Sequence, residues 1–160
     1  FNVYGPRQAL SNPYTGVCAI FISRIKNAHP PVIYEDGLQT RDFISVRDVI
    51  RANILAMEKK EADYQVFNVG SGRPVSIKDI ALTLIRLYKK SLRPDITGQY
   101  RKGDIRHCFA DISKIKRSLG FAPSVDFEDG LKELIEWSRQ QRASDGFEKA
   151  RRELEKKGLL

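Results

Sequence analysis

The chain has 160 residues, the length of a single domain, of which 41% are hydrophobic and 30% charged. That composition is typical of a folded globular protein and excludes disordered, collagen-like and disulfide-rich classes. The longest uninterrupted apolar stretch, residues 17–22, is far shorter than the ~20 residues that a membrane-spanning helix needs. The 28 basic and 20 acidic residues give a net charge of +8, which favours an anionic partner without identifying it.

Cysteine and histidine are scarce in this sequence. The two cysteines, Cys18 and Cys108, form no Cys-x-x-Cys pair, and His29 and His107 stand at no metal-ligand spacing. We therefore expect a reducing, cytoplasmic setting and no metal site. The sequence opens on Phe-Asn-Val-Tyr-Gly, an apolar strand pattern, so we expect it to begin inside a longer protein.

The first half of the chain alternates predicted strands, loops and helices. A short strand at 1–5 precedes an irregular loop at 5–14 that is rich in turn-forming residues. Apolar residues at positions 17, 20, 21 and 25 predict a helix that ends before Pro30. Extended runs at 32–34 and 41–44 flank a turn at 35–37. A helix over 46–57 then follows, with Ser45 as its N-cap.

The second half continues this alternation. A β-prone run at 65–69 stops at Gly70-Ser71-Gly72, and we predict that it is a strand. Ser76, with Asp79 three residues on, predicts a capped helix over 77–88. Extended pieces near 95–100 and 106–110 lead to a small helix that begins at 113 and ends at Gly120. A longer helix is expected at 127–141, followed by a charged helix at 145–157 with little apolar face.

This alternation predicts an α/β architecture. The runs at 1–5 and 65–69 resemble buried strands of a parallel sheet, which needs neighbouring strands and cover on both faces. Two such strands cannot form that sheet alone. We therefore expect part of the sheet to lie outside these residues.

Two familiar catalytic patterns find no support in the residues. Gly70-Ser71-Gly72 lies between a predicted strand and a helix, as a dinucleotide loop does, but Val75 stands where that motif needs its third glycine. A tight turn into a capped helix is the favoured interpretation. None of the six tyrosines is followed by a lysine four residues later, and neither histidine belongs to a nucleophile–histidine arrangement.

Two charged segments have the chemistry to recognise a phosphorylated sugar. Arg101-Lys102-Gly103-Asp104 combines two cations, a flexible glycine and an acceptor, and Arg41 beside Asp42 is similar. Guanidinium groups bind phosphate oxygens in pairs, and a carboxylate accepts hydrogen bonds from neighbouring hydroxyls. Taken alone, each segment is more often a solvated turn, and Tyr34 and Asn2 have equally ordinary structural interpretations.

Five motifs occur in order along the chain. They are Phe-Asn-Val-Tyr-Gly-Pro-Arg-Gln at 1–8, Tyr-Glu-Asp-Gly-Leu-Gln-Thr-Arg-Asp-Phe-Ile-Ser-Val-Arg-Asp-Val at 34–49, Phe-Asn-Val-Gly-Ser-Gly at 67–72, Arg-Lys-Gly-Asp-Ile-Arg at 101–106 with Ala-Asp-Ile-Ser-Lys at 110–114, and Leu-Gly-Phe at 119–121 with Gly-Leu at 130–131 ahead of Trp137. Together they resemble the extended short-chain dehydrogenase/reductases that act on nucleotide sugars.

This resemblance covers roughly residues 1–140. It is closest to the NAD-dependent epimerases of the UDP-glucose 4-epimerase-like branch. The loop at 9–16 and the tail at 153–159 also resemble a dTDP-rhamnose 4-epimerase-like branch. Dehydratases and decarboxylases of the superfamily share most of the same segments and remain alternatives.

The resemblance implies that the chain is the C-terminal half of such an enzyme. Residues 1–142 would hold the last strands of a Rossmann sheet, near 1–5 and 65–69, and a small mixed α/β substrate-binding domain, with a charged helical tail at 143–160. The NAD loop and the Tyr-x-x-x-Lys catalytic pair would lie upstream, so no catalytic residue is expected here and these residues alone are expected to be inactive. The whole protein would be a nucleotide-sugar 4-epimerase acting on a UDP- or dTDP-sugar.

Substrate-binding roles also follow from the resemblance. Asn2 is expected to contact the diphosphate or the sugar, Arg41 to pair with the diphosphate, and Arg101 to reach a phosphate. Asp104 would accept hydrogen bonds from ribose hydroxyls, while Tyr34 would lie against the base. The chemistry of the side chains and the resemblance both point to Arg41, Arg101 and Asp104 as substrate-binding residues.

Further contacts are implied near the cofactor and the sugar. Phe43 is expected to line the same wall as the base-binding tyrosine. Phe1 and Val3 would lie near the nicotinamide end of NAD. The segment Thr15-Gly16-Val17 would contact the sugar phosphate where a helix begins, because helix N-termini attract anions.

The expected partners are a nucleotide sugar, the missing N-terminal half and a second copy in a homodimer, with neither a membrane nor nucleic acid. Two other functions stay open. A basic nucleic-acid-binding module fits the net charge, although the basic residues are scattered and no strand platform or recognition helix is visible. A non-catalytic module that binds sugar nucleotides also fits the residues.

Overall fold

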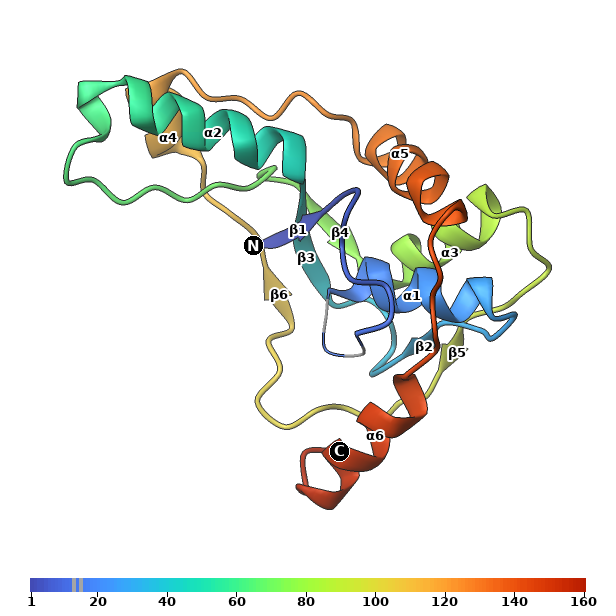
Figure 1. Cartoon of the computed structure of the whole chain (residues 1–160). Helices are drawn as coiled ribbons and strands as arrows, with labels where there is room; N and C mark the ends of the chain where they lie inside the picture. Colours follow the sequence, from blue (N-terminus) through green and yellow to red (C-terminus); the bar gives the residue numbers. More distant parts are fainter. Residues whose placement is uncertain (13, 15) are drawn as a thin grey trace.

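The structure is a computed structural model, and it describes residues 1–12, 14 and 16–160. Figure 1 shows its elements in chain order. They are β1 (Asn2–Tyr4), α1 (Val17–Lys26), β2 (Val32–Ile33), β3 (Thr40–Ser45), α2 (Val46–Glu58), a 3-10 turn (Lys60–Ala62), β4 (Pro74–Ser76), α3 (Ile77–Leu87), β5 (Asp95–Ile96), β6 (His107–Cys108), α4 (Ser113–Leu119), α5 (Phe127–Arg139) and α6 (Phe147–Lys156). None of the described helices has the length and hydrophobicity that a bilayer crossing requires.

β3 is the central strand of the larger sheet. Its second half pairs in parallel with β1, and its first half lies between β4, which is antiparallel, and β6, which is parallel. Arg41 is therefore flanked on both sides, by Val75 and by Cys108. β2 and β5 form a separate parallel pair. The predicted α/β class is confirmed, with one antiparallel pair beside the parallel ones.

Local signals place the helices where the sequence predicts them. Ser45 caps α2 by accepting a hydrogen bond from the backbone N–H of Arg47 at 3.2 Å. Ser76 caps α3 in the same way, with the N–H of Asp79 at 3.0 Å. Gly120 ends α4 with a φ of 66°, a left-handed conformation that glycine adopts at little cost.

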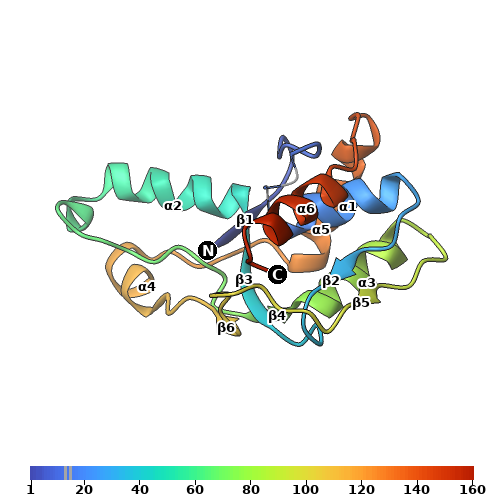
Figure 2. The ribbon, with the colours of Figure 1, turned by 90° about the horizontal axis from the view of Figure 1, so that it is seen from below.

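Two clusters of buried apolar side chains hold these elements together. The larger one joins α1, α3 and α5 around residues such as Ile22, Leu84 and Leu134. The smaller one joins α2 and α4 around Ile115 and Phe121. In Figures 1 and 2, α2 and α4 accordingly extend to one side of β3, away from the α1–α3–α5 group.

Residues 65–69 do not form the strand that the sequence predicts. The segment runs beside α4, where Lys114 Nζ donates to Val66 O at 2.9 Å and lies 5.0 Å from the Phe67 ring centroid. Phe67 packs on the smaller apolar cluster. The backbone N–H and C=O groups of α4 are hydrogen-bonded within the helix, so they cannot pair with residues 65–69 as a neighbouring strand would. Side chains hold this segment in place, and it forms no strand.

The predicted charged helix forms as α6, but it is not a detached tail. Ser23 Oγ donates to Ser144 O at 3.0 Å, and Asn27 Nδ2 donates to Ala143 O at 2.9 Å. Ala150 of α6 is buried. The segment therefore packs onto α1.

Asp48 ties α2 to the loop that precedes α5. Its buried carboxylate accepts hydrogen bonds from Ser124 N, Ser124 Oγ and Val125 N, each at about 3 Å, and pairs with Arg51. Burial raises the pKa of this carboxyl, but the hydrogen bonds from Val125 and Ser124 and the one from Arg51 outweigh it, so the pKa is below its ordinary value. A carboxyl with a lowered pKa stabilises the fold above the unfolded-state pKa and loses that effect as the pH falls.

We expect Asp48→Asn to lower the free energy of unfolding at pH 7 by about 1–3 kcal/mol, because one of the two acceptor oxygens becomes an NH2 group that faces the N–H donors of Ser124 and Val125. The difference in the free energy of unfolding between the variant and the unchanged protein should become smaller below about pH 4, where the carboxyl is protonated in the unfolded state. Thermal unfolding measured from pH 7 to pH 3 tests this. Asp63→Asn, on an exposed residue, serves as the control. A constant gap across that range would contradict the prediction.

Candidate functional site

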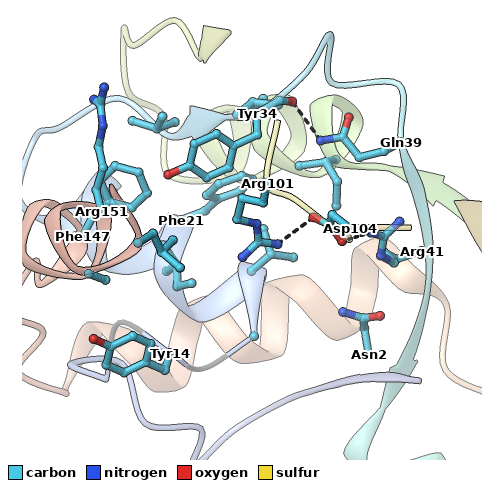
Figure 3. Close-up of a pocket in the computed structure, with 18 residues that line it drawn as sticks. Asn2, Tyr14, Phe21, Tyr34, Gln39, Arg41, Arg101, Asp104, Phe147 and Arg151 are labelled. Atoms are coloured by element: carbon cyan, nitrogen blue, oxygen red, sulfur yellow. Dashed lines mark hydrogen bonds and ion pairs between the residues drawn. The ribbon is translucent and has the colours of Figure 1, made fainter. Parts of the chain in front are cut away.

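A cavity of about 360 Å³ opens between α1, the start of β3, the loop before β6, and α6 (Figure 3). This volume is within the range of small-molecule sites. Both charged and apolar side chains line it. They are Asn2, Tyr14, Gly16, Val17, Ile20, Phe21, Val32, Ile33, Tyr34, Gln39, Arg41, Ile77, Arg101, Asp104, Phe147, Ala150, Arg151 and Leu154.

Two arginines from distant segments meet on one carboxylate at one end of this cavity. Arg41 Nη2 lies 2.8 Å from Asp104 Oδ1, and Arg101 Nη2 lies 2.8 Å from Asp104 Oδ2. Burial raises the pKa of Asp104, but the hydrogen bond and charge of Arg101 and the charge of Arg41 outweigh it, so the pKa is lowered. The carboxylate is therefore ionised near neutral pH, and the trio keeps one net positive charge.

The backbone fixes Arg41 in place. Its Nη1 donates to Thr40 O at 2.8 Å and to Arg106 O at 3.2 Å. Strand pairing on both sides fixes the backbone of β3 here, and the two carbonyl oxygens hold the guanidinium against it. Figure 3 shows Asn2, from β1, near the same charged group. The arrangement is preorganised for an anion that carries hydroxyl groups.

The middle of the cavity is aromatic and contains unpartnered oxygen atoms. The Arg101 guanidinium lies 5.7 Å from the Tyr34 ring centroid. Gln39 Nε2 donates to Tyr34 O at 2.9 Å, which orients the glutamine. Among the described residues, the buried Tyr34 Oη and Gln39 Oε1 find no hydrogen-bond partner. Buried polar atoms are almost always paired, so these two oxygens are free to hydrogen-bond with a polar ligand or with water in the cavity.

The start of α1 adds a weaker preference for anions. Gly16 is the N-cap residue, and no side chain of the described residues caps this helix end. Gly16 and Val17 both line the cavity. The positive end of the helix dipole is thus directed at the cavity.

The structure brings together most of the residues predicted to bind substrate. Asn2, Tyr34, Arg41, Arg101 and Asp104 line the one cavity, together with the Gly16-Val17 pair. They come from β1, β3, the segment after β2, the loop before β6 and the start of α1. Three more of the predicted site residues lie elsewhere, and the remaining one, Thr15, lies outside the described residues.

Phe43 does not line the cavity, contrary to prediction. It is 4% exposed and packs 5.8 Å from the Phe127 ring centroid in the larger core cluster. Its side chain contributes to the core rather than to a binding wall. Phe1 and Val3, expected near the cofactor, are about half exposed and lie outside the cavity lining.

Gly70-Ser71-Gly72 forms a closed turn rather than a phosphate loop. Asp42 accepts hydrogen bonds from the N–H groups of Ser71 and Gly72 at 2.7 and 2.8 Å. A Cβ at Gly70 would lie 2.5 Å from Ala110 Cβ, so only glycine fits there. A carboxylate already occupies the donors that a phosphate would need, which supports the structural interpretation of this motif.

α6 supplies cavity residues that the sequence analysis missed. Phe147, Ala150, Arg151 and Leu154 line one wall. They stand at i, i+3, i+4 and i+7, the spacing of one helix face. The spacing is visible in the sequence, but the many charged residues of this segment led to the prediction of a helix with little apolar face.

Comparisons with known proteins show which proteins this chain is similar to. Residues 1–70 match the model of the "NAD dependent epimerase/dehydratase family". The chain is 39% identical over 142 residues to dTDP-L-rhamnose 4-epimerase of Burkholderia thailandensis, covering 88% of this chain and 38% of that protein.

Solved structures are similar as well. UDP-glucose 4-epimerase from Thermotoga maritima, solved with UDP-glucose, has a TM-score of 0.78 and 41% identity, over 87% of this chain and 44% of that one. UDP-glucuronic acid 4-epimerase from Bacillus cereus, solved with UDP-glucuronic acid and NAD, has a TM-score of 0.77 and 33% identity, over 88% and 43%.

The chain spans about two fifths of the length of the curated relatives that it matches. The motifs, the α/β fold and these similarities agree with one another. Over 87–88% of its length the chain is similar to nucleotide-sugar 4-epimerases, and its residues 1–70 match the model of the NAD-dependent epimerase/dehydratase family.

Proposed function

We propose that this chain forms the nucleotide-sugar cradle of an NAD-dependent nucleotide-sugar 4-epimerase that uses a UDP- or dTDP-sugar. One observation carries the proposal most. Arg41 and Arg101, from segments far apart in sequence, converge on Asp104 at 2.8 Å each inside one cavity. A pyrophosphate-linked sugar presents the anionic oxygens and hydroxyls that such a group recognises.

Each of these residues has a distinct task in the cradle. Arg41, held by backbone carbonyls, gives a fixed donor pair for one phosphate. Arg101, about half exposed, can shift from the carboxylate onto the second phosphate. Asp104 then has lone pairs for ribose hydroxyls, and Tyr34 offers its ring to the base. Asn2 lies near the sugar end of the cavity.

Binding the remote diphosphate tightly has a catalytic use. Interactions with a part of the substrate that does not react can position the sugar and still let it turn about the phosphate bonds. A 4-epimerase needs such turning, because its sugar must present both faces to the same redox centre. The cradle of this chain therefore binds the diphosphate and leaves the sugar free to rotate. None of its residues is proposed as a catalytic acid or base.

The described residues do not form the glycine-rich loop that would hold the pyrophosphate of NAD, because their only Gly-x-Gly turn, Gly70-Ser71-Gly72, is closed by Asp42. Phe1 and Val3 are about half exposed, and their contact with the nicotinamide end of NAD stays a prediction. In this family NAD supplies the oxidation and re-reduction of the sugar. We assign its binding, with the family's Tyr-x-x-x-Lys pair, to parts of the protein other than these 160 residues.

The proposal predicts that Arg101→Ala weakens nucleotide-sugar binding. We expect the KM for UDP-glucose or a dTDP-sugar to rise 10–100-fold, because a charge-assisted contact worth about 1.5–3 kcal/mol is lost. Steady-state kinetics of the protein expressed from its whole reading frame test this, and product analysis with several UDP- and dTDP-sugars identifies the substrate. Lys102→Ala is the matched control, since it removes a positive charge from the same loop outside the cavity lining. An unchanged KM in Arg101→Ala would remove that residue from the cradle.

A further inference from the structure

α6 lies against the cavity and outside the apolar core. Ala150, Arg151 and Leu154 on its inner face line the cavity, and an extended segment joins the helix to α5 (Figure 1). Among the described residues, neither cluster of buried apolar side chains contains a residue of α6. Ala150 is the one buried residue of the helix. An element with so few apolar contacts separates from the rest of a fold at a low cost in free energy.

The segment immediately before α6 is fixed firmly to α1. Ser23 Oγ donates to Ser144 O at 3.0 Å. Arg24 pairs with Asp145 at 3.2 Å, where both side chains are less than a tenth exposed. The same guanidinium lies 4.6 Å from the ring centroid of Phe147, the first residue of the helix. The start of α6 is therefore held in place by buried contacts.

The far end of α6 is held much more weakly. Within the part of the chain that the structure describes, two hydrogen bonds join residues 151–160 to other elements. The hydroxyl of Tyr14 donates to Glu153 at an exposed position, and Lys102 N donates to Leu159 O at 3.0 Å. Exposed polar contacts contribute little to stability, because water competes for both groups. The two ends of the helix thus differ sharply in how they are anchored.

One of these weak contacts connects α6 to the cradle. Lys102 stands beside Arg101, and a hydrogen bond from Asp104 N to Arg101 O at 3.1 Å closes the turn that contains both. A ligand that fixes Arg101 therefore also fixes the backbone N–H that Leu159 accepts from. Such coupling is reciprocal, so the ligand stabilises the docked helix as much as the docked helix stabilises the bound ligand.

We propose that α6 is a lid, which turns about residues 143–146 to admit a ligand and then closes over it. This rests on the proposed function, because the ligand is taken to be the nucleotide sugar of the cradle. A site that encloses most of its ligand has to open one wall for entry and release. α6 is the helical wall that lies outside both apolar clusters. Its closure keeps water from the diphosphate, which strengthens the pairing with Arg41 and Arg101.

Hydrogen exchange of the whole protein, measured by mass spectrometry with and without UDP, tests whether α6 opens. A released helix of 10 residues is not stable in water by itself, so its amides exchange when the lid opens. Without UDP we expect the amides of residues 151–157 to exchange about 100-fold faster than those of α1, which opens only with the core. Saturating UDP should slow exchange in 151–157 about tenfold and leave α1 unchanged.

Dissociation kinetics test the contact that holds the lid closed. In Glu153→Ala we expect UDP to dissociate about 3–10-fold faster, measured by stopped-flow displacement of a fluorescent UDP analogue, because a charge-assisted hydrogen bond is lost. Glu153 does not line the cavity, so this effect has to act through α6. Tyr14→Phe should give the same increase, and the double variant no more, since both remove one contact. Glu155→Ala is the matched control, because it removes the same charge from α6 and its partner, Arg151, lies on the same helix.

The possible outcomes separate the lid from the proposed function. If UDP bound but α6 were as protected as α1 without it, the helix would be a fixed wall, and the lid would be overturned while the cradle would stand. Equal dissociation rates in Glu153→Ala and Glu155→Ala would overturn the lid in the same way. If the unchanged protein did not bind UDP, the proposed function would fail, and the lid would fail with it.

Discussion

Asp42→Ala is expected to lower the free energy of unfolding by about 3–5 kcal/mol, because it leaves several buried donors without a partner. Asp42 is fully buried in β3. Its Oδ1 accepts from Ser71 N and Ser71 Oγ at 2.7 and 2.6 Å, and its Oδ2 accepts from Gly72 N and Ala110 N at 2.8 and 3.1 Å. Three of these donors are backbone N–H groups, and alanine offers none of them an acceptor.

The position of Asp42 couples this loss of stability to the cavity. Arg41 precedes it in β3, and Ala110 follows β6, the strand that the loop bearing Asp104 leads into. The carboxylate therefore fixes β3, the 70–72 turn and the segment after β6 relative to one another. At low temperature, where Asp42→Ala is still folded, we expect it to bind UDP more weakly as well. The reason is that β3 and the segment around β6 are no longer fixed to each other, so the ion pair between Arg41 and Asp104 is disturbed.

Chemical denaturation of the unchanged protein, Asp42→Ala and Asp42→Asn checks this prediction. Asparagine keeps one acceptor oxygen, so Asp42→Asn should lower the free energy of unfolding by less than Asp42→Ala does. Asp63→Ala, on an exposed residue, controls for the removal of an acidic charge. If Asp42→Ala lowered the free energy of unfolding by less than about 1 kcal/mol, the freed N–H groups would have found other partners, and the hydrogen bonds to the Asp42 carboxylate would not be essential.

Local chemistry explains why much of the fold was predictable. The caps Ser45 and Ser76 act within three residues of their own position, so the sequence around them is sufficient to place α2 and α3. The same holds for the turn at Gly120. Arg41, Arg101 and Asp104 were predicted as substrate-binding residues because their chemistry suits a phosphorylated sugar and the family resemblance implies the same roles. The chemistry alone would have favoured solvated turns.

Features that depend on distant partners were not predictable. The run at 65–69 has strand composition, but its neighbour is helix α4, and that neighbour is determined by the tertiary fold. Phe43 was placed on the cavity wall by resemblance, whereas packing against Phe127 buries it in the core. The wall formed by α6 depends on the pairing of Arg24 with Asp145, two residues 121 positions apart.

Arg24→Met is expected to release α6 from the rest of the fold and to lower the free energy of unfolding by about 3–5 kcal/mol. Removing one partner of a buried ion pair leaves the other charge desolvated and uncompensated. Arg24 also donates from Nε to Pro30 O at 2.7 Å and stacks on Phe147, and both contacts disappear with the guanidinium. Asp145 would keep its contact with His29, whose ring is more than half exposed and shields the carboxylate poorly.

Denaturation and limited proteolysis of the whole protein measure this effect together. We expect new cleavage near residues 140–146 in Arg24→Met and a weaker affinity for UDP, because Phe147 and Arg151 leave the cavity with α6. The double variant Arg24→Met with Asp145→Asn should recover much of the stability, since no buried charge remains unpaired. Arg139→Ala, which breaks an exposed pair with Glu136, should cost less than about 1 kcal/mol. If Arg24→Met behaved like this surface control, the apolar face of α6 and its other hydrogen bonds would suffice to hold it, and the ion pair would have no role in closing the cavity.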